Sequence, residues 1–213
     1  MELIVYLLLI ITSVVGLTFV IERAIALRWR RVVPPEIEAA VESCQSPGDV
    51  PMLRRVCQQH KSPMSRLLLV AAEHLDWPKA EAVDALQTTA RREISRLERG
   101  LVVLEIIVGI APLLGLVGTI LGMMSVFGDV GQAGLTDAAK LAQGISLILR
   151  ATLFGLLIAI PALIFWSYYT KKVETIAVEM ETVCDEFVRR QYREEAQSPK
   201  SKVQSQVPEV STP

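Results

Sequence analysis

The feature that most constrains this chain is residues 111–170, which read APLLGLVGTILGMMSVFGD, a short polar turn, and then LAQGISLILRATLFGLLIAIPALIFWSYYT. No charged residue occurs in residues 106–128 or in residues 151–170. A run of about 20 apolar residues forms a helix long enough to cross the roughly 30 Å hydrocarbon core of a bilayer. The two runs therefore predict a membrane hairpin.

The apolar residues of the whole chain gather in three blocks, at residues 3–21, 106–128 and 141–170, in a sequence that is 51% hydrophobic. This pattern predicts an all-α integral membrane protein with three transmembrane helices. The first block follows Glu2 and no A-x-A cleavage site comes after it, so we expect an uncleaved anchor and not a signal peptide. The net charge of −1 gives no reason to expect a nucleic-acid partner.

The positions of the basic residues predict the orientation, because positive residues stay on the cytoplasmic side. They follow the first span, precede the second and follow the third, at Arg23, Arg28, Arg30, Arg31, Arg91, Arg92, Arg96, Arg99, Lys171 and Lys172. We therefore expect a multi-pass protein of the bacterial inner membrane with a periplasmic N-terminus. The expected parts are span one at 1–27, a cytoplasmic helical segment at 28–77, a long helix with span two at 78–128, a periplasmic turn at 129–140, a long helix with span three at 141–194, and a disordered tail at 195–213.

Two heptad-like apolar stripes continue spans two and three into the charged regions. They are Val83, Leu86, Ala90, Ile94, Leu97, Leu101 and Leu104, and then Val173, Ile176, Met180, Val183 and Phe187. The first stripe runs without a break into span two. The stripes predict long helices that project into the cytoplasm, pack along these residues and assemble into a homo-oligomeric bundle.

Prolines and small polar residues mark the helix starts in residues 35–77. Pro35, Pro51 and Pro63 suit first-turn positions, where a missing N–H costs nothing. Asp49 and Ser62 lie just upstream of two of them and are candidates for N-terminal caps.

Inside the hairpin, glycines and prolines replace the larger apolar residues expected of lipid-facing helices. The small residues Gly115, Gly118, Gly122, Gly144 and Gly155 allow close approach of helices. Pro112 and Pro161 each remove a backbone donor, and the freed carbonyls need partners in protein or water. Both features favour helices packed in a bundle.

Thr119 and Thr152 are the hydroxyls expected at one depth, each about nine residues from the outer end of its span, or about 13 Å. In a membrane helix such a hydroxyl commonly bonds a carbonyl of its own helix, which is the structural alternative to an ion-path role. Arg150 also has two interpretations. It either extends to the outer interface, or faces the bundle interior and meets a carboxylate there.

The rest of the chemistry is sparse. Cys44, Cys57 and Cys184 show no metal-type spacing, and His60 and His74 lie on different helical faces, so we expect no metal and no cofactor. No nucleophile–base pair or phosphate-binding loop is present, so we expect no enzyme. None of the spans contains a deeply placed carboxylate, so a proton relay would need a titratable group from a partner.

The sequences APLLGLVGTILGM at 111–123 and LAQGISLILRATLFGLLIAIPA at 141–162 resemble the MotA/TolQ/ExbB proton channel family, and the three-span, N-out topology resembles ExbB and TolQ. The resemblance implies a pentameric ring around single-span ExbD- or TolR-like partners, whose membrane Asp carries the proton. It also matches Thr119 and Thr152 to the ion path, and Pro112 and Pro161 to helix-shaping prolines. One position departs from the pattern, since Leu147 stands where many ExbB and TolQ sequences have Glu.

The function expected from this resemblance is that of a ring subunit in an energy-transducing complex driven by the proton motive force. The alternative that stays open is an oligomeric membrane scaffold that conducts nothing. A neighbouring gene for a single-span protein with a membrane Asp would separate the two. The process driven in the envelope, and proton against sodium as the ion, stay open at this point.

Overall fold

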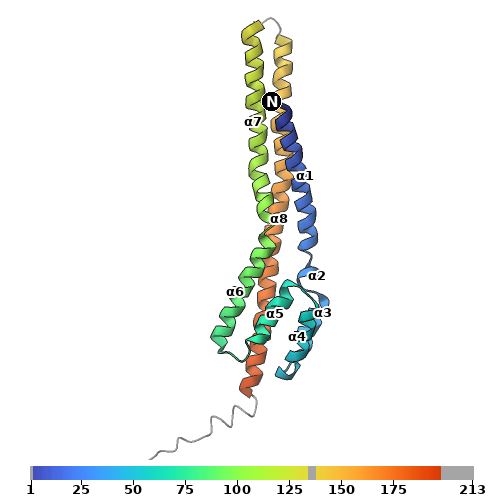
Figure 1. The fold of residues 1–213 in the computed structure, drawn as a ribbon, viewed down its shortest axis with the longest axis vertical. Helices are drawn as coiled ribbons and strands as arrows, with labels where there is room; N and C mark the ends of the chain where they lie inside the picture. Colours follow the sequence, from blue (N-terminus) through green and yellow to red (C-terminus); the bar gives the residue numbers. More distant parts are fainter. Residues whose placement is uncertain (1, 134–137, 198–213) are drawn as a thin grey trace, which may run out of the picture. The chain divides into compact units, whose positions relative to one another are not determined.

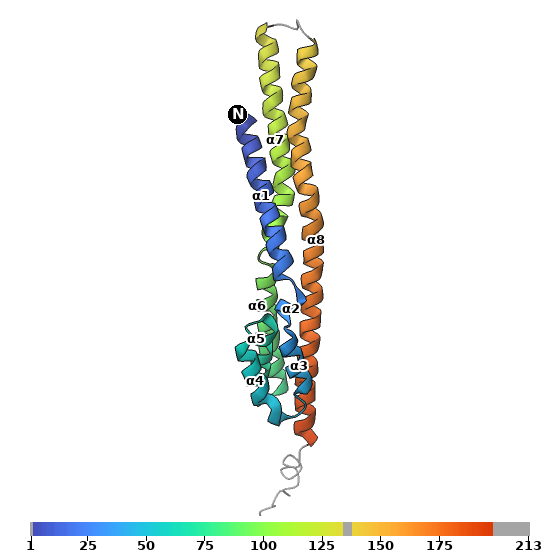
Figure 2. The same cartoon turned by 90° about the vertical axis from the view of Figure 1, so that its right-hand side faces the viewer.

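The computed structural model of this chain describes residues 2–133 and 138–197, and every element in these ranges is helical (Figures 1 and 2). In chain order the elements are α1 Glu2–Ala26, α2 Trp29–Val32, α3 Pro35–Ser43, the short 3₁₀ helix η1 Pro47–Asp49, α4 Val50–Gln59, α5 Pro63–Glu73, α6 Lys79–Glu98, α7 Leu101–Ala133 and α8 Ala138–Gln197. The expected all-α fold is confirmed. Most of the tail expected at 195–213 lies outside the described residues.

The chain divides into two compact units. The first, called here the spanning unit, comprises residues 1–26 and 98–172 and therefore contains α1, α7 and the first part of α8. The second, called here the charged unit, comprises residues 27–97 together with α8 from Val173 onward. Each unit is described separately below.

Three helices are long and apolar enough to cross a bilayer, at Leu3–Ala26, Leu101–Gly128 and Ala142–Arg193. Only 17%, 33% and 29% of their respective most apolar stretches are buried. Outward-facing Leu, Ile and Val side chains are therefore the rule in the spanning unit, as expected where lipid surrounds the protein. The expectation of three transmembrane helices is confirmed.

Within the spanning unit, α1 lies along α7 and runs in the opposite direction (Figure 2). Near its start, Val5 fits against Gly118 of α7, and near its middle Gly16 lies beside Ile107. At its end, the Arg23 side chain lies over Gly100 and forms a two-point ion pair with Glu22, with Nη2–Oε1 at 2.5 Å and Nε–Oε2 at 2.6 Å. This pairing balances the two charges that close the apolar run of α1.

The long helix expected over residues 78–128 is divided in the structure. A turn at Arg99–Gly100 separates α6 from α7. Gly100 lies in this turn, and glycine favours a break because its helix propensity is low. The apolar stripe continues through the break, since Leu97, Leu101 and Leu104 are all buried. Periodicity alone therefore did not reveal the interruption.

Both ends of the turn expected at residues 129–140 are helical in the structure. Helix α7 continues to Ala133 and α8 begins at Ala138, while residues 134–137 lie outside the described part. The expectation ended the helix at Asp129, where the apolar run ends. A charged residue ends a membrane span, but the backbone hydrogen bonds of an α-helix can continue past it.

In the charged unit, the apolar stripes form a core inside a single chain. The buried stripe residues are Leu86, Ala90, Leu97, Val173, Ile176, Met180 and Phe187, and they are joined by Ile37, Leu53, Met64, Leu67 and Leu68 from the shorter helices. The last turns of α8 also make polar contacts in this unit. Gln191 Nε2 donates to Cys44 Sγ at 3.8 Å, and the Tyr192 hydroxyl donates to the Trp77 carbonyl at 2.8 Å. The stripes therefore pack against helices of the same chain, and burying them does not require a second copy.

The helix starts in this unit follow the sequence signals with one difference. Pro35 and Pro63 are the first residues of α3 and α5, and Ser62 caps α5 by accepting the Ser65 N–H at 3.1 Å. Asp49 does not cap α4 with its side chain. Its carboxylate accepts the Ser46 N–H and hydroxyl, each at 3.0 Å, and these bonds hold the pKa of Asp49 below its usual value.

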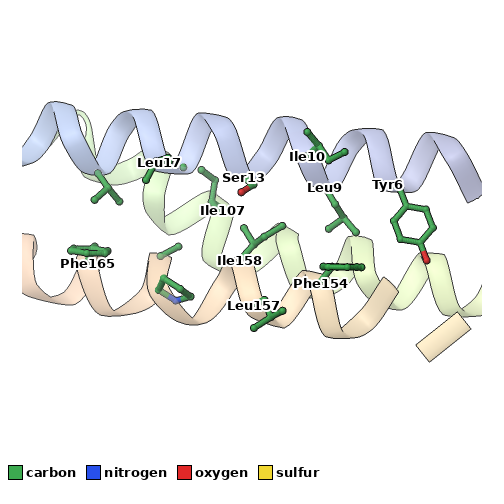
Figure 3. Close-up of a pocket in the computed structure, with 14 residues that line it drawn as sticks. Tyr6, Leu9, Ile10, Ser13, Leu17, Ile107, Phe154, Leu157, Ile158 and Phe165 are labelled. Atoms are coloured by element: carbon green, nitrogen blue, oxygen red, sulfur yellow. The ribbon is translucent and has the colours of Figure 1, made fainter. Parts of the chain in front are cut away.

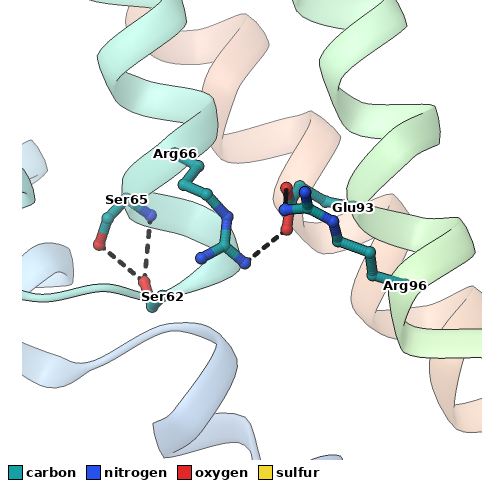
Figure 4. A network of polar contacts seen from close by, with 5 residues as sticks. All are labelled: Ser62, Ser65, Arg66, Glu93 and Arg96. Carbon is teal, nitrogen blue, oxygen red and sulfur yellow. Dashed lines mark hydrogen bonds and ion pairs between the residues drawn. The ribbon is translucent and has the colours of Figure 1, made fainter.

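A buried carboxylate joins two helices of the charged unit (Figure 4). Glu93 of α6 is 2% exposed, and its two oxygens pair with Arg66 of α5 at 2.5 Å and with Arg96 at 2.7 Å. A buried carboxylate is costly unless it is paired and hydrogen-bonded. Because both guanidinium groups reach solvent, the arrangement fixes α5 against α6 without burying a net charge.

Candidate functional site

The candidate site is the line of contact between α7 and α8, called here the seam. Glycines on α7 face it, and each would clash with α8 if it carried a Cβ. At Gly118 that atom would lie 2.8 Å from Ala151 Cβ, and at Gly122 it would lie 2.6 Å from Ile148 Cγ1. Close approach of this kind replaces hydrophobic burial as the source of stability between helices in a bilayer.

At the centre of the seam the two backbones touch directly. A Cβ on Gly155 would lie 2.6 Å from the Ala111 carbonyl oxygen and 3.2 Å from Gly115 Cα. A Cβ on Gly115 would lie 2.9 Å from Thr152 Cα. Backbone atoms cannot move aside as flexible side chains can, so these two glycines fix the separation of α7 and α8. Nearer the hairpin end, Gly144 faces Val126.

The two prolines lie at different places. Pro112 follows Ala111 at the seam and is half-buried, whereas Pro161 is exposed on the side of α8 that faces α1. Each lacks an N–H, so the carbonyls of Val108 and Leu157 lose their usual helical partners. The prolines are therefore not part of one cluster.

Thr152 lies in the seam, half-buried. Its hydroxyl donates across the helix pair to the Gly115 carbonyl oxygen, with Oγ1 and O 3.3 Å apart. This bond does not follow the common pattern in which a threonine bonds its own helix. It can form because the absence of a side chain at Gly115 brings Thr152 close to the α7 backbone.

Thr119 follows the common pattern. Its hydroxyl donates to the Leu116 carbonyl of its own helix at 2.7 Å. The half-buried side chain lines a shallow apolar groove on α7 with Ile120, Met123, Met124 and Phe127. Thr119 therefore lies at the edge of the surface that α7 presents, while Thr152 lies inside the helix pair.

One peptide group nevertheless connects the two threonines. In an α-helix the carbonyl of residue 115 accepts the N–H of residue 119. The same Gly115 carbonyl accepts the Thr152 hydroxyl. Together with the contact between Gly118 and Ala151, this places Thr119 and Thr152 at about the same depth. A change in charge near one threonine can therefore polarise the hydrogen bond of the other.

Arg150 lies two residues before Thr152, and its side chain is exposed outside the seam. It does not face the seam. Leu147 lies on α8 as well, and its side chain falls outside what the structure describes. In the described helices, the stretches 3–21, 106–128 and 151–170 carry no charged residue, so no titratable carboxylate lies beside the threonines.

Ala151 is one of the seam residues that sequence reasoning missed. It is 3% exposed and meets both Gly115 and Gly118 of α7. Ala151 and Gly155 form a small-xxx-small pair, which is the signal that would have identified it. The hydrogen bond between Thr152 and Gly115 has no such signal, since it depends on the register of the two helices. Among the described residues, no three His, Cys, Asp or Glu side chains gather closely enough to hold a metal ion.

Three apolar helices and a glycine seam without charged groups define a multi-pass helical membrane protein. The sequence profile of the MotA/TolQ/ExbB proton channel family matches residues 59–182, which is more than half of the chain. The chain belongs to this family.

Individual relatives agree with this assignment. A biopolymer transport protein ExbB homolog of Methanothermobacter thermautotrophicus is 34% identical over 145 residues, which cover 68% of this chain and 51% of that protein. The biopolymer transport protein ExbB of Helicobacter pylori is 41% identical over 81 residues, covering 38% of this chain and 56% of that protein. The ExbB-like protein 3 of Synechocystis is 32% identical over 160 residues, which cover 72% of this chain and 74% of that protein. The chain thus spans about half the length of the first two relatives.

Proposed function

We propose that this chain is the ring subunit of an inner-membrane complex that couples ion flow down the proton motive force to work in the cell envelope, as ExbB- and TolQ-like proteins do. The observation that carries the proposal is a pair of threonines on two adjacent helices at one depth. The Gly115 carbonyl accepts the Thr152 hydroxyl and lies one turn before Thr119, in a helix pair with no carboxylate beside the threonines and in a chain of the proton channel family.

The titratable group comes from a partner. A single-span helix of the ExbD or TolR type would lie along the face of α7 that carries Thr119 and the apolar groove next to it. A threonine hydroxyl has one donor hydrogen and two acceptor lone pairs, so it can donate to a carboxylate and accept from the protonated acid. One elementary charge crossing 100 mV releases about 2.3 kcal/mol, which is enough to bias the rotation of one helix set against another.

Several copies of the chain form the ring, and a pentamer is the state that the family resemblance implies. The cytoplasmic stripes are buried inside the single chain, so contacts between copies are proposed to involve the outward faces of α7 and α8. The N-terminus and the hairpin end are placed in the periplasm, with the charged unit in the cytoplasm. The distribution of Arg and Lys supports this orientation.

A non-conducting scaffold is the second candidate, favoured by two observations. Leu147 offers no carboxylate, and the Thr119 hydroxyl already has a partner in its own helix. A scaffold would need the glycine seam for assembly but would not need the hydroxyls. The two candidates therefore differ in what removal of the hydroxyls does.

The test uses the chain co-purified with its single-span partner and reconstituted into proteoliposomes that carry an internal pH dye. We expect Thr119→Val and Thr152→Val to assemble normally and to reduce proton flux about tenfold or more, because a lost hydrogen bond to a charged group costs about 1.5–3 kcal/mol. Serine at either position should restore part of the flux. Thr18→Val is the matched control, since Thr18 donates to the Val14 carbonyl within α1 at 2.8 Å.

Native mass spectrometry of each variant verifies that the complex is intact. Undiminished flux in the Thr119→Val, Thr152→Val double variant would rule out a role for the hydroxyls in the ion path. Absence of voltage-driven flux in the intact wild-type complex would favour the scaffold.

A further inference from the structure

The spanning unit contains an apolar slot of about 540 Å³ between α1 and α8 (Figure 3). Leu9, Ile10 and Leu17 of α1 form one wall, Phe154 and Leu157 of α8 form the other, and Ile107 of α7 forms the floor. The slot is open along one side, since Ile10, Leu17 and Leu157 are 61%, 63% and 56% exposed. It is not part of the seam, which lies between α7 and α8.

Aromatic contacts bridge α1 and α8 at both ends of the slot. At one end the rings of Tyr6 and Phe154 meet edge to face, with centroids 6.3 Å apart. At the other end the Tyr169 hydroxyl donates to the Val20 carbonyl at 3.0 Å. Tyr6 precedes Val20 on α1, and their partners Phe154 and Tyr169 come in the same order on α8. The two helices are therefore parallel. The slot extends over the interval from Tyr6 to Val20, about 21 Å at 1.5 Å per residue.

An exposed cation lies just beyond the Tyr6–Phe154 end. Arg150 precedes Phe154 by one helical turn, so both side chains lie on the same side of α8. Because Tyr6 is level with Phe154 in two parallel helices, Arg150 is level with the first turn of α1, where the apolar run begins at Leu3. Arg150 is two residues nearer the start of α8 than Thr152, and from there its long side chain can extend along α8 to the membrane interface. No ion pair joins Arg150 to another described side chain.

We propose that the slot binds one acyl chain of an anionic phospholipid whose phosphate group pairs with Arg150. The acyl chain enters over the edge of the Tyr6 and Phe154 rings and lies along Leu9, Ile10 and Leu17. The Tyr6 hydroxyl, at the same end, gives the headgroup a second polar partner. Under the proposed topology this lipid belongs to the periplasmic leaflet.

The size of the slot favours an acyl chain over a helix from a second copy. A helix about 10 Å across and 21 Å long would occupy roughly 1600 Å³, about three times the volume available. The slot is also as long as one leaflet of the hydrocarbon core, which is about 15 Å thick, with a few ångströms to spare. Its lining offers few polar side chains, with Ser13 near the middle, so water is a poor occupant.

The test uses the full-length chain in nanodiscs that contain a trace of phospholipid with a diazirine near the end of one acyl chain. The probe is supplied as phosphatidylglycerol or as phosphatidylcholine with identical chains. After photolysis, labelled peptides are quantified by mass spectrometry. We expect phosphatidylglycerol to label the slot residues Ile10, Leu17 and Leu157 about fivefold more than Leu7 and Val14, which are equally exposed on α1 but lie outside the slot.

Two variants separate the parts of the proposal. Arg150→Gln should abolish the preference for phosphatidylglycerol over phosphatidylcholine. Ser13→Leu should fill the slot and reduce its labelling to the level of Leu7 and Val14, whereas Gly109→Leu, whose added Cβ meets nothing within 4 Å, should leave the labelling unchanged. Circular dichroism verifies that each variant stays folded.

Equal labelling of the slot and of Leu7 and Val14 would overturn the proposal, as would equal labelling by the two headgroups in the wild-type chain. Ser13→Cys offers an independent check on a protein occupant. Efficient disulfide-linked dimers through this position would assign the slot to a second copy and also overturn the proposal.

Discussion

Leu68 of the charged unit is fully buried, whereas Leu7 of α1 in the spanning unit is 56% exposed, although both belong to apolar helical runs. The contrast holds throughout the two units. Exposed large apolar residues are scattered in the described charged unit, at Met52, Trp77 and Val178, but cover the outer faces of all three spanning helices. In water, helices are held together by removing large apolar side chains from solvent. In lipid that force is absent, and small residues that allow close contact replace it.

Buried polar groups differ between the units as well. The charged unit buries a carboxylate, Glu93, and pairs it with Arg66 and Arg96. The spanning unit uses uncharged groups, with Thr152 donating to a backbone carbonyl. Paired charges can be kept where their partners reach water. At the depth of Thr152 an ion pair would lose that support, so hydroxyls are the less costly way to link helices.

The largest expected effect comes from making one substitution in both units. Leu68→Ala should destabilise the protein by about 2–5 kcal/mol, because it leaves a cavity in a closed core. Leu7→Ala should cost less than about 0.5 kcal/mol, because lipid or detergent fills the space. Chemical denaturation in detergent micelles, followed by circular dichroism, measures both. Similar losses at the two positions would show that α1 is covered by protein and would weaken the comparison.

Adding a methyl group at a glycine of the seam, the reverse of shortening a leucine, should lower the stability of the spanning unit. Gly155→Ala places a Cβ 2.6 Å from the Ala111 carbonyl oxygen, and we expect a loss of about 1–3 kcal/mol from forcing α7 and α8 apart. Gly109→Ala is the matched control on α7, since its Cβ would meet nothing within 4 Å. It should leave stability unchanged or raise it slightly through helix propensity. The same denaturation experiment applies, and a tolerated alanine at Gly155 would contradict the backbone contact.

The smallest expected effect sharpens the comparison by testing whether the core of the charged unit is closed. Burial raises the pKa of Cys57 to about 11 and that of Cys184 to about 12, from a usual value of 9.0. Because the folded state raises these pKa values, the stability that comes from burying neutral thiols is fully present below pH 9. It is lost as the pH rises toward 11–12. At pH 8 a maleimide should therefore modify these thiols slowly, and quickly only after unfolding.

Ser43→Cys, at the exposed end of α3, supplies the reactive control in the same chain. Mass spectrometry of tryptic peptides gives the rate at each position. If Cys57 and Cys184 react as fast as the introduced cysteine, the core is open to solvent, and the contrast with the lipid-facing unit is smaller than described.

The charge-free runs were sufficient to predict three spanning helices, because few other structures accommodate so many apolar residues. The division at Gly100 was not predicted, although a glycine beside Arg99 was an available signal. The periodic stripe through Leu97 and Leu101 outweighed it. The stripes were also interpreted as assembly surfaces, and the structure places them in the core of one chain. Periodicity identifies a buried face but does not say what covers it.

At the candidate site, residue types were predictable and contacts were not. The glycines, Thr119 and Thr152 could be selected from composition, depth and family resemblance. The different bonds of the two hydroxyls depend on the register between α7 and α8, which no local pattern encodes. The slot between α1 and α8 likewise depends on how two helices separated by more than a hundred residues are spaced.

The backbone contacts of the seam have a mechanical consequence. Where side chains meet, helices can slide by changing rotamers, but Gly115 and Gly155 leave no rotamers to change at the closest point. The hairpin of α7 and α8 should therefore behave as a stiff rod under load. The face of α7 beside Thr119 differs, because the unbranched side chains of Met123 and Met124 there can change conformation.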